Sequence, residues 1–203
     1  MEAATKAQRR ALLLASRRSV AETVHQAEAE ALAAHAATLV SARTPVCAYV
    51  PMKTEPGSIA LLDALSATGV KVLLPVSRTD AHGDPLPLWW SSYSRGELIP
   101  AAFGLLEPAG EASPPATIAE AQIILVPALA VDRRGVRLGR GAGFYDRSLP
   151  LRNPIAKLIA VVRDEELLDE LPGEPHDVPM THALTPGNGL VELGSEAGMR
   201  TAE

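Results

Sequence analysis

The N-terminal part of the chain has the residue pattern of helices. Residues 5–41 contain no glycine or proline and are rich in alanine, leucine, glutamate and arginine, which are strong helix formers. Ser19 is followed three positions later by Glu22, the spacing of a capping box, which predicts that a second helix begins there. We therefore expect two helices, over residues 5–17 and 20–41, before Pro45.

Beyond Pro45 the hydrophobic positions form short continuous runs separated by a helical repeat. Residues 46–50 and 70–76 are apolar runs of strand length. Between them, residues 58–68 place apolar side chains at helical spacing, and Gly69 closes that segment. A strand, a helix and a second strand in this order are typical of a parallel pair.

The second half of the chain continues this alternation. A further strand is predicted over residues 86–90, whereas the glycines and prolines of residues 104–117 are typical of a loop. A helix is expected over residues 144–149, and residues 187–203 lack periodicity and are expected to fray. Apolar runs predict three more strands, over 123–126, 157–162 and 183–185.

Alternating strands and helices predict an α/β fold, specifically a three-layer α/β/α sandwich around a mostly parallel sheet. We expect a single domain over residues 1–203, in which the helical pair 5–41 packs on an α/β core at 45–186, with a tail at 187–203. Because ligands bind beyond the carboxyl ends of parallel strands, the loops after Val50, Val76 and Val126 are the expected place for a site.

The charge, the apolar stretches and the single cysteine indicate in which compartment this protein works and which kinds of partner it has. The 24 acidic and 19 basic residues give a net charge of −5, so we expect no nucleic-acid partner. No apolar stretch approaches the ~18 residues of a membrane span, and arginines interrupt the N-terminal apolar residues, unlike a signal peptide. Cys47 is the only cysteine and lies in an apolar run, where we expect it to be buried. We therefore expect a reduced, cytoplasmic protein without membrane contact.

The segment with the clearest chemistry is IILVPALAVDRRGVRLGRGAGFYDRSL, residues 123–149. Its glycines let backbone N–H groups converge on an anion, and a predicted helix N-terminus near Phe144 adds partial positive charge. Arg137 and Arg140 add forked donors suited to phosphate oxygens, and Asp146 offers a carboxylate for Mg²⁺. The segment therefore predicts a polyphosphate site. The alternative is a surface turn, since the spacing is neither the dinucleotide fingerprint nor a Walker loop.

The same segment resembles the signature of a known family. RLGRGAGFYDRSL, preceded by VPALAVDRRG, is similar to the motif of the 5-formyltetrahydrofolate cyclo-ligases, also called 5,10-methenyltetrahydrofolate synthetases. Other family landmarks occur in the same order over about residues 5 to 186. These landmarks are Lys6 with Arg10, residues 49–55, 74–75, 104–108 and 171–177.

The resemblance implies an ATP-driven enzyme with a fold similar to the ribose-phosphate isomerase and CoA-transferase group. In the implied reaction, ATP phosphorylates the formyl oxygen of 5-formyltetrahydrofolate, N10 attacks the activated carbon, and phosphate leaves to give 5,10-methenyltetrahydrofolate and ADP. Phosphoryl transfer of this kind depends on positioning and charge neutralisation. The implied cofactors are Mg²⁺ and ATP, the partners are small molecules, and we expect a monomer or weak dimer.

The resemblance also implies residue roles. Arg140 and Tyr145 are the implied catalytic residues, and Asp146 and Asp177 the implied Mg²⁺ ligands. ATP is implied to bind Lys6, Arg10, Arg137, Leu138, Gly139, Arg140, Gly141, Ala142, Gly143, Phe144 and Tyr145. The folate is implied to bind Arg10, Val50, Glu55, Arg140, Gly141, Ala142, Gly143 and Phe144.

The chain departs from the family pattern at three places. Glu55 is followed by Pro-Gly-Ser instead of Val-Asp-Thr, so the local backbone is expected to differ. Phe144 replaces the first tyrosine of the usual pair, which keeps a stacking face and loses a hydroxyl. Ala142 stands where relatives carry glycine or lysine, and it supplies no charge.

The residues to which the resemblance assigns a role also have a purely structural interpretation. Lys6 and Arg10 form one basic helix face, Glu55 is a helix-preceding acid, Asp146 lies in a first helical turn, and Tyr145 packs. Asp177 lies in a turn-like stretch. Two other functions remain open: a non-catalytic folate- or nucleotide-binding module, and an enzyme handling CoA or sugar phosphates on a similar fold.

Overall fold

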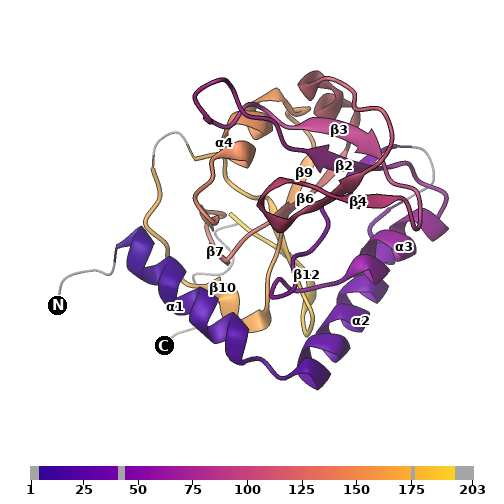
Figure 1. The fold of residues 1–203 in the computed structure, drawn as a ribbon. Coiled ribbons are helices and arrows are strands. Elements are labelled where there is room, and N and C mark those ends of the chain that lie inside the picture. The colour runs from indigo at the N-terminus through magenta and orange to yellow at the C-terminus, as the bar shows by residue number, and fades with distance from the viewer. Residues whose placement is uncertain (1–4, 41–43, 175–176, 195–203) are drawn as a thin grey trace, which may run out of the picture.

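A computed structural model describes residues 5–40, 44–174 and 177–194 (Figure 1). The helices are α1 (Lys6–Ser19), α2 (Glu22–Thr38), α3 (Ile59–Ala67) and α4 (Phe144–Ser148), with 3₁₀ turns η1 (Ala102–Gly104), η2 (Pro115–Glu120), η3 (Leu149–Leu151) and η4 (Asp164–Glu166). The strands are β1 (Val46–Cys47), β2 (Val72–Val76), β3 (Trp89–Ser92), β4 (Leu98–Pro100), β5 (Leu106–Pro108), β6 (Ile123–Pro127), β7 (Ala130–Asp132), β8 (Arg137–Leu138), β9 (Lys157–Val161), β10 (Leu167–Leu168), β11 (His182–Thr185) and β12 (Gly189–Glu192).

A seven-stranded sheet forms the centre of the described part of the chain, in the order β12-β11-β9-β6-β1-β2-β3. Its five inner strands pair in parallel, and only the edge strands β12 and β3 run antiparallel to their neighbours. Two small sheets, β10-β7-β8 and β4-β5, lie beside it. The predicted α/β class with a mostly parallel sheet is confirmed.

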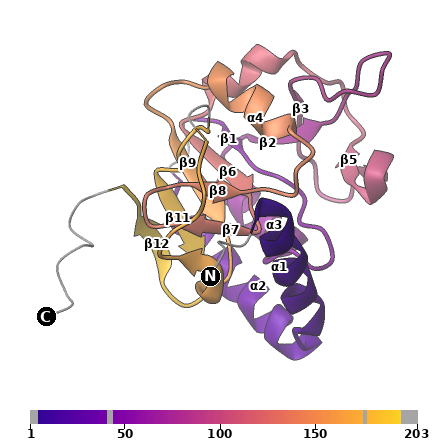
Figure 2. The ribbon, with the colours of Figure 1, turned by 90° about the vertical axis from the view of Figure 1, so that its left-hand side faces the viewer.

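Side chains along the inner strands alternate between the two faces of this sheet, as the pleat requires. On β6, Ile124 faces one core cluster and Leu125 the other. The cluster that contains Leu125 is covered by α2 and α3, which supply Leu32, Leu61, Leu62 and Leu65. The opposite cluster is covered by η2 and η3, which supply Ile118 and Leu149. The result is a three-layer arrangement, and Figure 2 shows the strands between α2 on one side and α4 on the other.

The N-terminal helices differ from the prediction at their junction. The capping box expected at Ser19 and Glu22 is wrong, because Ser19 still belongs to α1 and its hydroxyl donates to the carbonyl of Ser16. Glu22 is the first residue of α2, so it lies too early to close a box, and Ala21 caps α2 without a side-chain bond. A capping box is present instead at the start of α1, between Thr5 and Gln8.

The expectation of a frayed tail at 187–203 is wrong for its described part. Residues 189–192 form β12, which pairs antiparallel with β11 and places Leu190 opposite Leu184. The pairing extends the sheet by one edge strand, although residues 189–192 have too short a pattern to reveal it. Positions 195–203 of the predicted tail lie outside the described residues.

Most other predicted elements are present with shifted ends. The strand expected over 86–90 is β3, which begins three residues later and ends two residues later, and the loop expected over 104–117 contains β5 and part of η2. Cys47 is fully buried, and burial raises the pKa of its thiol, so it behaves as a small core residue. None of the described helices combines the length and apolarity needed to cross a bilayer.

Candidate active site

A cavity of about 310 Å³ opens at the carboxyl ends of the inner strands, where the topology predicts a site. Val50, Ser77 and Ala128 line it from the segments that follow β1, β2 and β6. The full lining is Tyr49, Val50, Met52, Glu55, Pro75, Ser77, Leu88, Leu105, Leu106, Glu107, Pro127, Ala128, Arg137, Gly139, Arg140, Gly141, Ala142, Gly143, Phe144, Tyr145 and Asp146.

The glycine- and arginine-rich loop forms one side of this cavity. The loop follows the β7–β8 hairpin directly. Leu138, at the end of β8, fixes the start of the loop because its side chain is buried against Ala130 and Leu171. Leu138 is therefore not among the lining residues, although it is flanked by Arg137 and Gly139, which are. The loop is thus fixed at its base and presents its backbone to the cavity.

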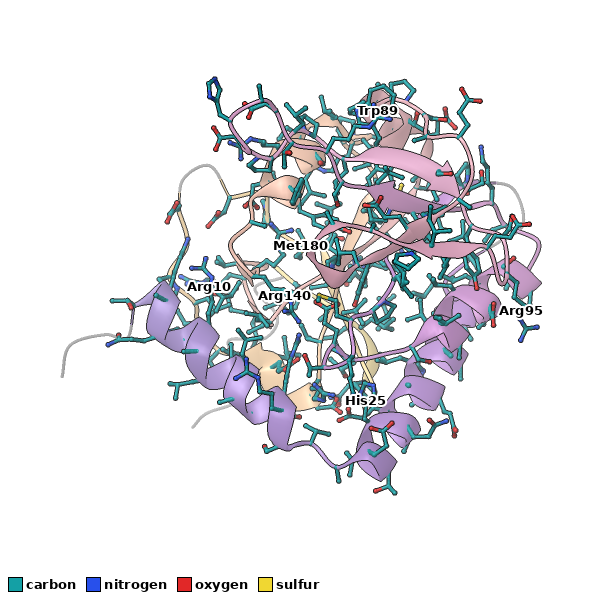
Figure 3. The ribbon with its side chains drawn as sticks, viewed as in Figure 1. Arg10, His25, Trp89, Arg95, Arg140 and Met180 are labelled. Atoms are coloured by element: carbon teal, nitrogen blue, oxygen red, sulfur yellow. The ribbon has the colours of Figure 1, made fainter. Side chains whose placement is uncertain are left out.

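Gly141 lies where this loop passes helix α1. Its φ of +98° lies in the left-handed region, and a Cβ there would lie 3.6 Å from the Arg10 guanidinium carbon. Arg10 donates from Nε to the carbonyl of Gly139 over 2.9 Å. Figure 3 shows Arg10 reaching from α1 toward the region of Arg140. Arg10 therefore lies against the glycine- and arginine-rich loop.

Arg140 and Glu55 join the two sides of the cavity. The Nε atom of Arg140 donates to Oε1 of Glu55 over 2.9 Å, across 85 positions of the chain. Glu55 is 6% exposed, and its Oε2 accepts the backbone N–H of Met52 over 2.9 Å. No acceptor among the described residues engages the terminal nitrogens of Arg140, so the pair orients that guanidinium and leaves donors for a ligand.

The residues after Glu55, which differ from the family pattern, connect a tight turn to α3. Glu55 donates its backbone N–H to the carbonyl of Met52, which closes a tight turn. Ser58 then caps α3 by accepting the N–H of Ala60. The expected change of backbone is compatible with a carboxylate aimed at the cavity, since Glu55 remains a lining residue.

Arg137 and Asp146 form a second ion pair in the cavity wall. Asp146 accepts a hydrogen bond from Nη2 of Arg137, while Nε and Nη1 of Arg137 are buried and have no partner among the described residues. Buried guanidinium donors without acceptors are costly unless a ligand or water satisfies them. Arg137 is therefore a candidate anion ligand.

The aromatic pair lies next to these charges. Tyr145 places its ring 5.9 Å from the Arg137 guanidinium, and its hydroxyl is buried without a partner in the described structure. Burial raises the pKa of Tyr145, so this hydroxyl stays protonated and acts as a donor. Phe144 and Ala142 also line the cavity.

Lys6 and Asp177 lie together, outside the cavity lining. The Lys6 ammonium contacts Glu174 at 2.9 Å and Asp177 at 3.6 Å, and the hydrogen bond to Glu174 raises the pKa of Lys6. Asp177 also accepts the backbone N–H of Glu174. Lys6 is thus ion-paired in this state, and a phosphate would have to compete with these two carboxylates for it.

The implied Mg²⁺ ligands are compatible with that ion in their chemistry. Mg²⁺ favours one or two carboxylates completed by phosphate oxygens and water, and Asp146 is half-exposed beside the candidate anion ligand Arg137. Among the described residues no group of three or more metal-binding side chains gathers, so an all-protein cage is not seen there. The residues fit a metal that arrives with a phosphate.

Two structural features bear on how the loop attracts an anion. α4 has five residues, so its terminus is a weak source of positive charge, and the arginines supply the attraction. The first part of the motif is structural, because Asp132 is fully buried and accepts backbone N–H groups of Arg134, Val136 and Leu171.

Several lining residues have no role predicted from the sequence. Glu107 lies half-buried in the wall, and its Oε1 accepts the backbone N–H of Ser77 over 2.8 Å. Met52, Leu88 and Leu105 add apolar surface. Glu107, Leu105, Met52 and Pro75 fall within family landmarks, which was the available signal, whereas Leu88 carries no distinctive pattern.

Comparison with known proteins shows the family of this chain. The model of the 5-formyltetrahydrofolate cyclo-ligase family matches residues 2–186. A 5-formyltetrahydrofolate cyclo-ligase of Mycolicibacterium smegmatis is 60% identical over 194 residues, which cover 95% of this chain and 100% of the relative.

Solved structures show the same fold. The NMR structure of 5,10-methenyltetrahydrofolate synthetase from Aquifex aeolicus superposes with a TM-score of 0.70 at 24% identity, covering 98% of this chain and 96% of that one. The corresponding synthetase of Mycoplasma pneumoniae gives 0.67 at 16% identity, covering 87% and 96%. With the family model spanning most of the sequence and a close relative matching end to end, the chain belongs to the 5-formyltetrahydrofolate cyclo-ligase family.

Proposed function

We propose that this enzyme converts 5-formyltetrahydrofolate and ATP into 5,10-methenyltetrahydrofolate, ADP and phosphate. The formyl oxygen attacks the γ-phosphorus and ADP leaves; N10 then attacks the activated carbon, loses its proton, and phosphate departs. The observation that carries this proposal is the Glu55–Arg140 pair, which places a carboxylate acceptor and a guanidinium donor in one cavity. A pterin with N–H donors and a polyphosphate need these two groups side by side.

The arginines provide the charge neutralisation. Arg140, oriented by Glu55, has its terminal nitrogens available for the transferring phosphoryl group, and Arg137 adds two buried donors. Arg10 and Lys6 extend this surface from α1, and residues 138–143 supply backbone N–H groups. Preorganised donors of this kind stabilise a transition state in which negative charge spreads over phosphoryl oxygens.

The apolar wall holds the folate. Val50 and Phe144 present apolar surface to the cavity, and Phe144 offers a ring face. Each oxygen of Glu55 already accepts one hydrogen bond and retains a second lone pair for a pterin N–H. Tyr145, kept protonated by burial, donates its hydroxyl to an oxygen of the reacting groups.

Asp146 and Asp177 would hold Mg²⁺ together with the ATP phosphates. When bound there, the ion would supply neutralisation of phosphate charge and orientation of the γ-phosphoryl group. In the structure each carboxylate contacts a cation that we assign to the phosphates, Arg137 for Asp146 and Lys6 for Asp177. Binding of the loaded nucleotide therefore requires both pairs to exchange partners.

Replacing Asp146 by asparagine is expected to raise the Mg²⁺ concentration for half-maximal activity by about tenfold or more, because one charged ligand is lost. Titration of activity with Mg²⁺ at saturating ATP measures this. Asp169→Asn is the matched control, since that side chain is 99% exposed and lies outside the cavity lining. An unchanged Mg²⁺ requirement in Asp146→Asn would remove Asp146 from the metal site.

The reaction itself is tested by following methenyl absorbance and ADP release with purified protein, 5-formyltetrahydrofolate, ATP and Mg²⁺. We expect both products in equal amounts, and none when ATP is omitted. Absence of both products would overturn the proposal. Tight binding of both ligands without turnover would instead favour a non-catalytic binding module, which the loss of the first tyrosine hydroxyl at Phe144 makes the second candidate.

We further propose small-molecule partners only, in the cytoplasm where ATP is supplied, and a monomer or weak dimer. The net charge of −5 disfavours a nucleic-acid partner. Sedimentation velocity at micromolar concentration would reveal a stable larger oligomer, which would contradict the last point.

A further inference from the structure

Helix α1, which bears Lys6 and Arg10, is attached to the protein mainly through polar contacts. Arg17 is the one buried residue along this fully described helix, with 3% of its surface exposed. Arg9 donates to the carbonyl of Glu170, and Leu13 packs half-buried against a small cluster. A surface helix normally docks through an apolar stripe, so α1 depends on Arg17 to an unusual degree.

Arg17 ties α1 to the wall of the cavity. Its guanidinium forms a two-pronged pair with Glu166, from Nε to Oε1 at 2.6 Å and from Nη2 to Oε2 at 2.7 Å. Nη2 also donates to the carbonyl of Ala128 over 2.6 Å. Ala128 lines the cavity, whereas Arg17 does not. The contact therefore supports the wall without being part of it.

Arg163 extends this network to the opposite wall. Its backbone N–H donates to Oε2 of Glu166 over 2.8 Å, and its side chain is 1% exposed. The Arg163 guanidinium donates to Glu28 of α2 over 2.7 Å and to the carbonyl of Thr54 over 3.3 Å. Thr54 immediately precedes Glu55.

His25 marks the α2 end of the network in Figure 3, where its Nδ1 lies 3.2 Å from Nη2 of Arg163. Arg17, Glu166 and Arg163, called here the Arg17 network, thus connect α1 and α2 with both cavity walls. Arg17 contacts the carbonyl of Ala128, and Arg163 contacts the carbonyl of Thr54.

A buried network of ion pairs fixes the relative positions of its side chains closely, but it adds little to the stability of the fold. Removing charges from water is costly, and only near-ideal geometry repays it. Apolar side chains can fill such a site with similar stability, but they do not fix directions as a forked pair does. The burial of all three charged side chains is therefore better explained by positioning than by stability.

We propose that Arg17, Glu166 and Arg163 are positioning residues for the proposed reaction. They set the distance between the phosphate-binding face of α1 and the folate-binding walls at Ala128 and Glu55. The proposal rests on the proposed function of this cavity, because it assigns Lys6 and Arg10 to ATP.

Replacing Arg17 by methionine tests this. We expect the Kd for Mg-ATP and the KM for ATP to rise at least about tenfold, with a smaller change in kcat, because α1 no longer holds its cations in register. Arg17→Lys should recover part of the loss, since an ammonium reaches Glu166 but cannot make both prongs and the Ala128 contact. Arg18→Met, at the exposed neighbouring arginine, should match the parent.

A second variant separates positioning from folding. Arg17→Met combined with Glu166→Gln leaves no unpaired buried charge from this pair, and glutamine still accepts the Arg163 N–H. We expect thermal unfolding within a few degrees of the parent and the raised Kd to persist. An unchanged Kd and KM in both variants, with only kcat and the unfolding temperature lowered, would overturn the proposal.

Calorimetric titration with Mg-ATP alone keeps the two proposals distinguishable, since it requires no turnover. A parent that binds Mg-ATP but forms no methenyl product would refute the proposed reaction, while the comparison of Kd values would still decide the role of the Arg17 network. Weakened binding in the Arg17 variants would then support positioning of a nucleotide site alone.

Discussion

Replacing Arg140 by alanine is expected to lower kcat/KM for ATP-dependent cyclisation by about 10²–10³-fold, the usual cost of removing one preorganised donor from a developing negative charge. The same change leaves Glu55, which is 6% exposed, without its cation. Steady-state kinetics with both substrates varied measures the loss, and we expect it in kcat as well as in KM for ATP.

Arg95→Ala is the control for this experiment. Arg95 is also an ion-paired arginine, with Asp63, but its side chain is 83% exposed and Figure 3 shows it far from Arg140. Its loss should leave the kinetics unchanged. If Arg140→Ala retained more than half of the parent's kcat/KM, the assignment of Arg140 to the phosphoryl group would be wrong.

Replacing Gly135 by alanine is expected to cause the largest loss of stability of any change considered, at least about 3 kcal/mol of unfolding free energy. Gly135 has a φ of +90°, and a Cβ there would lie 2.3 Å from the carbonyl oxygen of Met180. Met180 also donates its N–H to the carbonyl of Gly135 over 2.8 Å, so the two backbones cannot separate without losing that bond. Urea unfolding followed by circular dichroism measures the difference.

Gly69→Ala separates the clash from the dihedral strain. Gly69 has a φ of +84° at the end of α3, but a Cβ added there would meet nothing within 4 Å, so only about 1–2 kcal/mol of left-handed strain is expected. Equal losses at Gly69 and Gly135 would show that contact with Met180 does not matter.

The Gly135 prediction illustrates where sequence reasoning was incomplete. The density of glycine and arginine over residues 132–143 indicated an anion-binding loop, and its second half does line the cavity. Nothing in the local pattern separates Gly135, where an added Cβ would clash with the Met180 backbone, from Gly141, where a Cβ would make ordinary contact with Arg10 and only the φ of +98° favours glycine. Both contacts come from residues distant in sequence.

Strands also differ in whether a local pattern predicts them or only tertiary contacts form them. Continuous apolar runs predicted β2, β6 and β9, because a buried parallel strand must be apolar on both faces. β7, β8 and β10 have two or three residues each, too few to establish any period, and they form because their partners are brought near by the main sheet.

Hydrophobic periodicity, a local property, was by itself enough to predict the α/β class and the carboxyl ends of the strands as the place where the cavity opens, and motif spacing predicts phosphate binding by residues 137–143. Tertiary structure alone decided which charges meet: Arg140 with Glu55, Asp146 with Arg137, and Arg17 with Glu166 and Ala128. The physical reason is that an ion pair depends on distances of a few ångströms between segments far apart in the chain, and no local pattern encodes those distances.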